Sequence, residues 1–467
     1  MANIITKART GIARFIAPGS LQQSQVNLFN EAFFAFIGGT VTSYDAKGQT
    51  YLDEGYNKNP DVFSVISQIS RKFASVPGVL KKEKDKKLAK QYYEAKDLGI
   101  KRILETKAFD DVEISEPLDR PNYYQTESEF KELWETFMLL NGNAYQWLLC
   151  PEEGPNAGRP IARFLLPSHL MYIVLKKDAD LSSAESPIDH YKLIIGNSYI
   201  DFKAEDIIHS KFPNPNYDLN GSHLYGQSPL KASLRNVQSQ NVTIDENIKT
   251  MKNRGVYGFI HAKDGQTPLT HPQAEELKEK LVKMSASADN LGRIAGSSAA
   301  VGFTQMSINT KDLMPFEFLK YDQKAICNAL GWSDKLLNND EGAKYDNLDA
   351  AWKMPISNRI TPDLKIYEQG LNEKYYPRFK ELAGAKVVFD VSELPEMQQD
   401  MKALVEWMEK ALDNGAITPE EFRIALKYPE TNMPEMKQHY LKTGLTPIED
   451  VAVNELASAR AFNLDKE

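Results

Sequence analysis

The feature that most constrains the fold is an unbroken helical pattern from Ser228 to Arg254. Its only proline is Pro229, and proline is tolerated in the first turn of a helix because its missing N–H would have no partner there. At 1.5 Å per residue, such a helix is about 40 Å long. Apolar side chains recur along it at alternating spacings of four and three, with one polar position: Leu230, Leu234, Val237, Asn241, Ile244, Ile248 and Met251.

Alternating spacings of four and three form a heptad seam, which is typical of helices that pack side by side. The other faces of this stretch are rich in Ser, Gln, Asn, Lys and Arg. Such a helix is too polar for the middle of a core. We therefore predict that it buries one stripe against helices of its own kind or against a partner.

The rest of the chain predicts a mixed α+β protein. Strands are expected at Ala144–Leu149, Ile161–Leu166, Met171–Leu175, His190–Ile195 and Asp206–Lys211. Helices are expected from Pro60 to just before Pro77, over Phe130–Leu140 and Pro315–Leu330, from about Leu348 to Tyr376 with breaks near Pro355 and Pro362, and along a stripe from Met401 to Leu412. Residues 1–58 are expected to form an arm followed by short strands, and Lys81–Lys87 a solvated surface.

Charge and cysteine content restrict the possible function. The 467 residues include 56 Lys and Arg against 64 Asp and Glu, a formal net charge of −8. Tight binding of nucleic acid needs basic side chains that neutralise phosphates, so only loose or sliding contact with DNA is compatible with this balance. The two cysteines, Cys150 and Cys327, cannot form a disulfide framework or a zinc site of their own. No apolar run approaches the roughly 18 residues that a membrane-spanning helix needs.

Motifs for catalysis, cofactors and metals are missing. The sequence has neither of the glycine-rich phosphate loops and no His-Glu-x-x-His. Residues Asn216–Asn220 resemble the start of a calcium loop, but the twelfth position is Gln227 instead of the required Glu, so a loop of Asx-turns is the alternative. Cys327 lies in an apolar helical pattern and is expected to be a buried small residue. We predict no catalytic residue, no metal ligand, no cofactor and no enzymatic activity.

Five short motifs, in this order, resemble those of portal proteins of tailed bacteriophages of the siphovirus type. They are the helix from Asn59 to Pro77, Leu-Leu-Asn-Gly-Asn-Ala-Tyr at 139–145, Asp-Ile-Ile-His at 206–209 with Tyr-Gly-Gln-Ser-Pro-Leu at 225–230, Ala-Ile-Cys-Asn-Ala-Leu-Gly at 325–331, and Asn-Gly-Ala-Ile-Thr at 414–418. Each motif alone is short, but their order and spacing cover residues from about 59 to 430.

The resemblance implies an architecture of wing, stem, clip and crown around an axial channel, mainly helical there, with an α/β wing and a small α/β clip. On this chain it implies an N-terminal arm and wing over 1–225, a stem helix over 226–256, a clip over 257–307, a second stem helix over 308–331, a tunnel loop over 332–349, a wing return and long helix over 350–395, a crown over 396–445 and a C-terminal tail over 446–467.

It also implies a function and partners. A ring of about twelve subunits would sit at one vertex of the virion capsid, after assembly in the host cytoplasm, and conduct double-stranded DNA during packaging and ejection without reading its sequence. Partners would be the large terminase subunit, a head–tail adaptor, and the major capsid and scaffold proteins, with no membrane. Another head–tail connector or scaffold-binding virion protein is the alternative, and an enzyme with a dispersed site is a third possibility.

Candidate site residues fall into four groups. The tunnel loop would present Asn338, Asn339, Asp340, Glu341 and Lys344 to the DNA; the stem would carry Lys249, Lys252 and Arg254; the ring interface would use Leu234, Val237, Ile244 and Ile248; and the clip would offer Glu275, Glu276, Lys278, Glu279 and Lys280 to the terminase. The Ile and Leu positions of the stem would pack either laterally or against the second stem helix.

Overall fold

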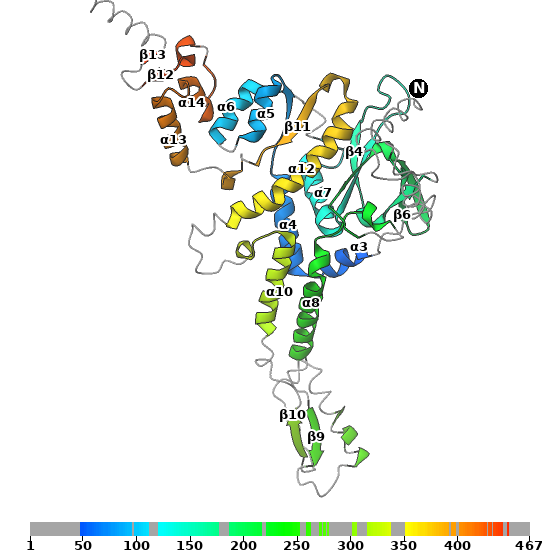
Figure 1. The fold of residues 1–467 in the computed structure, drawn as a ribbon. Helices are drawn as coiled ribbons and strands as arrows, with labels where there is room; N and C mark the ends of the chain where they lie inside the picture. The colour runs from blue at the N-terminus through cyan, green and yellow to red at the C-terminus, as the bar shows by residue number, and fades with distance from the viewer. Residues whose placement is uncertain are drawn as a thin grey trace, which may run out of the picture.

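The computed structural model describes most of the chain. The described residues are 47–95, 98–111, 120–176, 186–216, 221–252, 258–262, 270–279 without 273 and 277, 301–305, 315–337, 351–391, 394–397, 401–426, 428–441 without 432, and 446–447. They form a broad upper body from which two helices extend downward to a small two-stranded unit (Figure 1). The mixed helix-and-sheet class predicted from the sequence is confirmed.

The main core lies between helix α4 (Pro60–Ala74), helix α7 (Glu127–Asn141) and a long helix that runs from 351 to 375. Asn59 caps α4 by accepting hydrogen bonds from the amides of Asp61 and Val62. A Thr126–Glu129 capping box begins α7, and Gly142, with φ 74°, ends it. Local capping signals therefore set the ends of these helices. The Asn59 start of α4 and the end of α7 are as predicted, while the capping box starts α7 at Glu127, before the predicted Phe130.

Three antiparallel sheets of three strands build the body. One has the order β11 (Ala385–Phe389), β1 (Gly78–Glu83), β2 (Phe109–Asp111); the second β4 (Ala162–Leu166), β3 (Asn143–Leu149), β8 (Ile207–Lys211); and the third β5 (Met171–Leu175), β6 (Ile188–Ile195), β7 (Ser198–Lys203). The second sheet covers the core beside α7, and the third packs around Tyr145 and Tyr225 in a core of its own. The sequence did not predict β7, because five of its six residues are exposed and no apolar alternation marks it.

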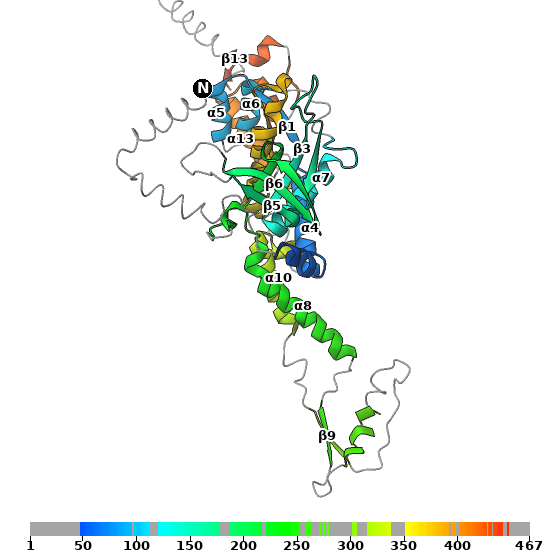
Figure 2. The same cartoon turned by 90° about the vertical axis from the view of Figure 1, so that its right-hand side faces the viewer.

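Helices α8 (Leu230–Lys252) and α10 (Pro315–Leu330) pack against each other and project from the body (Figures 1 and 2). Beyond their free ends, β9 (Gly258–Ala262) and β10 (Val301–Gln305) pair antiparallel over five residue pairs. Both helices lie where the sequence places them, and α10 ends as predicted at Gly331, whose φ is 72°.

At the opposite side of the body, α13 (Met401–Asp413) and α14 (Pro419–Ala425) pack on α6 (Leu98–Ala108), which pairs with α5 (Lys86–Glu94) (Figure 1). The Thr418–Glu421 capping box predicted from the sequence is formed. Arg102 donates to the Ala425 carbonyl over 2.8 Å, and Ile103 joins the apolar contact with Leu404.

Two predictions for the first part of the chain are wrong. Residues 47–56 are helical, as α3 (Lys47–Thr50) and η1 (Tyr51–Tyr56), where short strands were expected. The helix places Tyr51 and Gly55, four residues apart, against the body, and Gln49 donates to Asp53, also four residues on, over 3.0 Å. Residues 1–46, the predicted arm, lie outside the described part.

The predicted solvated run Lys81–Lys87 is also only partly exposed. Lys81 lies in the central strand of its sheet and is buried. Its ammonium group pairs with Glu105 and lies 5.3 Å from the Tyr92 ring centroid. The carboxylate and the aromatic face together compensate the buried charge, which a run of like charges in a sequence does not reveal.

The predicted helix breaks near Pro355 and Pro362 do not occur. The helix continues through both prolines because its turn widens to a π-helical turn at η7 (Ile356–Ile360), between 351–355 and α12 (Thr361–Gly370). A wide turn makes room where a proline ring would press on the preceding carbonyl. The buried side chains of Ile356, Ile360 and Leu364 hold this stretch on the core.

Candidate functional site

The stem, defined as α8 and α10, is anchored in the body by its upper half. Leu230 and Val237 of α8 and Ile326 and Leu330 of α10 all belong to the main core, and Val237 is only 1% exposed. Burying such side chains contributes roughly 1.5–3 kcal/mol each. The upper half of the heptad seam is therefore occupied within a single chain.

A buried network of amides joins the stem to α4. Asn59 donates to Gln240 over 2.9 Å and to Asn241 over 3.2 Å, while Gln240 donates to one oxygen of Asp61 over 2.7 Å. Gln323 of α10 donates to the other oxygen of Asp61 over 2.9 Å. Asn241 is the polar position of the heptad seam, and these partners fix the register of α8 against the body.

Asn143 ties the start of α8 to the second sheet. Its Oδ1 accepts from the Gly226 amide over 2.6 Å and from His209 Nε2 over 3.0 Å, and its Nδ2 donates to the Gly226 carbonyl over 3.2 Å. The His209 ring stacks on Tyr145 with centroids 4.4 Å apart. Burial, together with Lys211 and Lys374, lowers the pKa of His209 well below its ordinary value, so the ring is neutral and donates from Nε2.

The two glycines of this region allow the backbones to meet. A Cβ on Gly226 would overlap the Gly142 carbonyl, and a Cβ on Gly142 would overlap the backbone of Gln227. Ser228 then donates to the Leu139 carbonyl over 3.2 Å and accepts from the Leu230 amide over 3.1 Å. The motif residues quoted from 139–145, 206–209 and 225–230 thus converge on one buried joint, for which the sequence suggested no role.

The lower half of the stem leaves apolar side chains uncovered. On α8, Val242 is 60% and Ile248 is 45% exposed, while Ile244 is half-buried; on α10, Phe318 is 61% and Tyr321 is 69% exposed. Of the four predicted ring-interface residues, Val237 packs within the chain, against the core shared with α10. Leu234 and Ile244 are partly covered, and Ile248 lies open. Val242, Phe318 and Tyr321 were not predicted, because they lie off the heptad seam or on the other helix.

The remaining predicted site residues are described in part. Glu275, Glu276, Lys278 and Glu279 are helical and exposed, and Lys280 lies outside the described residues. Lys249 and Lys252 lie in the last turn of α8, their side chains not among those described, and Arg254 lies outside. All five tunnel-loop residues, Asn338, Asn339, Asp340, Glu341 and Lys344, also lie outside.

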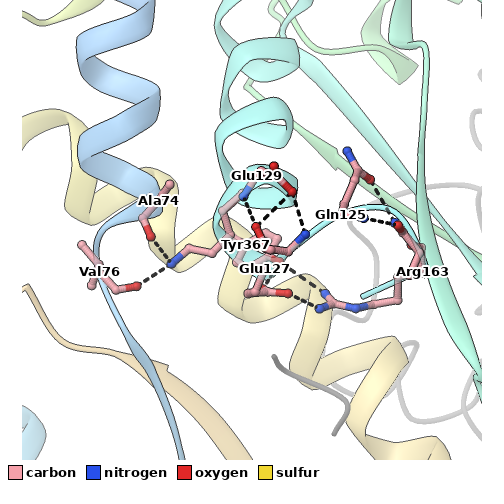
Figure 3. Close-up of polar contacts among 10 residues, drawn as sticks. Ala74, Val76, Gln125, Glu127, Glu129, Arg163 and Tyr367 are labelled. Atoms are coloured by element: carbon pink, nitrogen blue, oxygen red, sulfur yellow. Dashed lines mark hydrogen bonds and ion pairs between the residues drawn. The ribbon is translucent and has the colours of Figure 1, made fainter. Parts of the chain in front are cut away.

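A second buried polar cluster connects β4, α7 and the long helix (Figure 3). Arg163, fully buried, donates to Glu127 over 2.7 Å and to the Tyr367 hydroxyl over 3.2 Å, and that hydroxyl donates to Glu127 over 2.8 Å. One turn along α7, Lys131 donates to the carbonyls at the end of α4, those of Ala74 and Val76. Burial lowers the pKa of Lys131 to about 8.

The calcium-like loop and Cys327 were the motifs considered for metal binding and nucleophilic chemistry, and residues 217–220 of the loop lie outside the described part. In the described part of the calcium-like loop, Asn216 donates to Asn214 over 2.9 Å and to Gln227 over 2.8 Å. No group of three or more His, Cys, Asp or Glu suited to a metal ion occurs among the described residues. Cys327 is buried as predicted, and burial raises the pKa of its thiol to about 12. None of the helices in the described ranges is long and apolar enough to cross a membrane.

Comparison with known proteins gives one family and one relative among the curated proteins. The family model described as "Phage portal protein" matches residues 60–426. An uncharacterised protein of Rickettsia bellii (strain RML369-C) is 24% identical over 257 residues, which are 53% of this chain and 63% of that protein. The match therefore spans less than two thirds of the relative's length.

Solved structures share the fold. The neck of a native gene transfer agent particle, computed with C12 symmetry, superposes with a TM-score of 0.59 and 21% identity, covering 86% of this chain and 100% of that one. A virion of the native gene transfer agent gives the same TM-score and identity, covering 86% of this chain and 99% of that one.

Proposed function

The chain belongs to the phage portal protein family, and from this premise we propose that about twelve copies form a ring around a DNA channel at one vertex of the virion capsid. Its family is a structural one, and we propose that this chain likewise acts as a conduit and docking platform and carries out no catalysis. The neck structure that shares its fold was computed with C12 symmetry, which supports a ring of twelve. The family match favours a portal protein over a different head–tail connector.

The observation that carries the ring is the exposed apolar surface of the lower stem. Val242 and Ile248 lie on α8, and Phe318 and Tyr321 lie on the neighbouring helix α10. These residues lie on two helices, so the α8 residues of one copy can pack against the α10 residues of the next. A head-to-tail contact of this kind, repeated from copy to copy, forms a closed ring when the rotation between neighbouring copies adds up to a full turn.

The two-stranded unit beyond the stem supports the same conclusion. Strands β9 and β10 pair only with each other in the described part of the chain, and an isolated pair of strands is marginally stable in water. Neighbouring copies placed side by side would complete this sheet. We therefore propose that 257–307 is a clip that is stabilised by the assembly.

The ring is tested by placing a charge in the lower stem. We expect Ile248→Asp to leave a folded chain with an unchanged circular dichroism spectrum but to abolish rings in mass photometry, because burying an unpaired carboxylate between subunits costs several kcal/mol. The matched control is Ile161→Asp, since Ile161 is an equally apolar residue, 63% exposed and outside the stem. Intact rings in Ile248→Asp would exclude the lower stem as the subunit interface.

The remaining predicted segments are assigned to parts of this ring as proposals. We propose that the tunnel loop, predicted over 332–349, lines the channel with its residues after Leu337, since Trp332 is buried in the main core, and that it makes weak contacts with phosphates that do not depend on sequence. The net charge of −8 per copy repels phosphate and lets DNA slide. The clip would dock the large terminase subunit during packaging and the head–tail adaptor afterwards, and the wing would face the capsid and scaffold proteins.

A further inference from the structure

Ionisable side chains follow one another at one-turn intervals along the contact between α7 and the long helix. Their spacing of four residues places each set on one helix face. The α7 residues are Glu127, Lys131 and Glu135, and the long-helix residues are Arg359, Asp363 and Tyr367. The side chains thus lie at three successive turns of the contact, and at two of these turns the α7 residue has hydrogen-bond partners. Glu127 is bound by Arg163 and Tyr367, and Lys131 by the carbonyls at the end of α4. The third turn contains Glu135, Asp363 and Arg359.

Glu135 and Asp363 form a buried carboxyl pair. Glu135 is fully buried, Asp363 is nearly so, and neither Glu135 oxygen has a hydrogen-bond partner that is a donor among the described residues. Burial first, and then the neighbouring Asp363 carboxyl, raise the pKa of Glu135 well above its ordinary value of 4.5. Two ionised carboxylates can only accept, so the pair forms a hydrogen bond only when one of them holds a proton.

Among the residues that the structure describes, Arg359 is the only positive group acting on this pair. Its Nε lies 2.8 Å from Asp363 Oδ2, and the charged groups that act on Glu135 are Asp363 and Arg359. The guanidinium lies over the Phe212 ring, 4.6 Å from its centroid. One positive charge against two carboxyl groups balances only if one carboxyl is neutral, because an extra buried charge is costly.

Arg359 also belongs to the wide turn η7, where the helix departs from its regular hydrogen bonding. Its side chain lies against Gly331, the residue that ends α10. The group that balances the carboxyl pair is therefore on a π-helical turn of the long helix, in contact with the end of the stem. Single π-helical turns inside α-helices are frequent where a helix changes its register.

We propose that Glu135 and Asp363 share one proton, that with Arg359 they form a proton latch holding η7 and α12 on α7, and that loss of the proton releases this contact. In the closed state the neutral Glu135 hydroxyl donates to Asp363, which keeps its ion pair with Arg359. Removing the proton to solvent leaves two carboxylates facing one guanidinium. The helix then opens at η7, where the carboxylates gain access to water.

The direction of the pH effect follows from linkage. The closed latch holds the proton more tightly than the opened form, whose carboxyl has the ordinary pKa of 4.5. The latch is therefore strongest in acid, and opening increases about tenfold per pH unit between that value and the raised pKa of the closed state. Above the raised pKa the opening reaches a plateau.

Hydrogen–deuterium exchange of the full chain across this pH range, corrected for the intrinsic pH dependence of exchange, measures the opening. We expect amides of 356–366 to lose protection by about tenfold per unit. Amides of α4 serve as the internal reference below about pH 8, because Lys131, whose pKa is about 8, stays charged there and keeps its bonds to the end of that helix. Constant relative protection of 356–366 would overturn the proposal.

Glu135→Gln separates the latch from general effects of pH. Its amide donates to Asp363 without a titrating proton, so protection should stay high and independent of pH. The matched control is Glu132→Gln on the same helix, whose carboxylate pairs with the exposed Arg71 over 3.4 Å; this variant should behave like the unsubstituted chain. A pH dependence that persists in Glu135→Gln would contradict the latch.

Infrared spectroscopy tests the shared proton in the unsubstituted protein. The carbonyl stretch of a protonated carboxyl should be present at pH values where 356–366 is protected, disappear as that protection is lost, and be missing in Glu135→Gln. Absence of this band while 356–366 is protected would overturn the assignment. The latch lies inside one chain and does not rest on the ring, so mass photometry of the same samples distinguishes its failure from a failure to assemble.

Discussion

Asn143 shows how a single side chain can decide the position of the longest helix. It satisfies both backbone groups of Gly226, just before α8, and holds the neutral His209 ring. Asn143 and Gly226 are buried and His209 is half-buried, so each buried group that loses its partner costs about 1–3 kcal/mol. The motif residues are therefore explained by geometry: they join the stem to the body.

Asn143→Ala should lower the free energy of unfolding by about 2–4 kcal/mol, because it leaves the Gly226 amide and carbonyl without partners. Chemical denaturation of the full chain at a fixed concentration measures this loss. Asn216→Ala, which removes exposed loop hydrogen bonds only, should change stability by less than about 1 kcal/mol. Equal effects of the two substitutions would show that the Asn143 joint contributes no more than a surface loop.

Residue type alone also gives the wrong expectation about which charged side chains are buried. Lys81, Lys131 and Glu135 read as surface residues in a sequence, since such side chains are rarely buried without partners. The partner of Lys81 is Glu105, Lys131 bonds the carbonyls at the end of α4, and Glu135 lies beside Asp363. These are distant in sequence, so no local pattern could have predicted the clusters.

Elements with strong local signals were predicted almost to the residue. Helix α10 has the predicted bounds, and α4 and α14 begin at their predicted caps, because caps and glycine ends depend on a few adjacent residues. Residues 47–56 and the prolines of the long helix were misjudged, because there packing on the core outweighs the local signal. Of the stem interface, the sequence identified the seam but could not show which half is buried within the chain.

The clip helix is the element whose exposure allows a test of docking. Glu275 and Glu279 are four residues apart and both exposed, so they share one face. If that face meets the motor, Glu275→Lys with Glu279→Lys should weaken binding of the large terminase subunit to assembled rings by about tenfold at low salt. Surface plasmon resonance measures this, with Glu153→Lys in an exposed wing loop as control. Unchanged affinity would remove this face from the interface.

On the scale of the whole molecule, a narrow stem carries a small sheet at one end and joins a broad body at the other (Figures 1 and 2). The lower stem and the small sheet are not stable structures by themselves, because the lower stem exposes apolar side chains and the sheet has only the two described strands. The body, in contrast, has a large continuous core. A chain built this way is complete only in an assembly, which the long polar helix already indicated in the sequence.

The proposed tunnel loop after Gly331 is the segment expected to meet the DNA. We expect deletion of Asn339–Ala343 to leave rings intact, because α10 and the 3-10 turn Asp334–Leu336 precede the deleted residues and are held by their own contacts. A channel loop of mixed charge should contact phosphates weakly and through many copies at once, so the deletion should reduce DNA packaged per prohead while ring yield stays unchanged. Replacing the same residues with a Gly-Ser segment of equal length separates loss of side chains from loss of length. Full packaging by the deletion variant, with rings confirmed by mass photometry, would show that this loop does not act on the DNA.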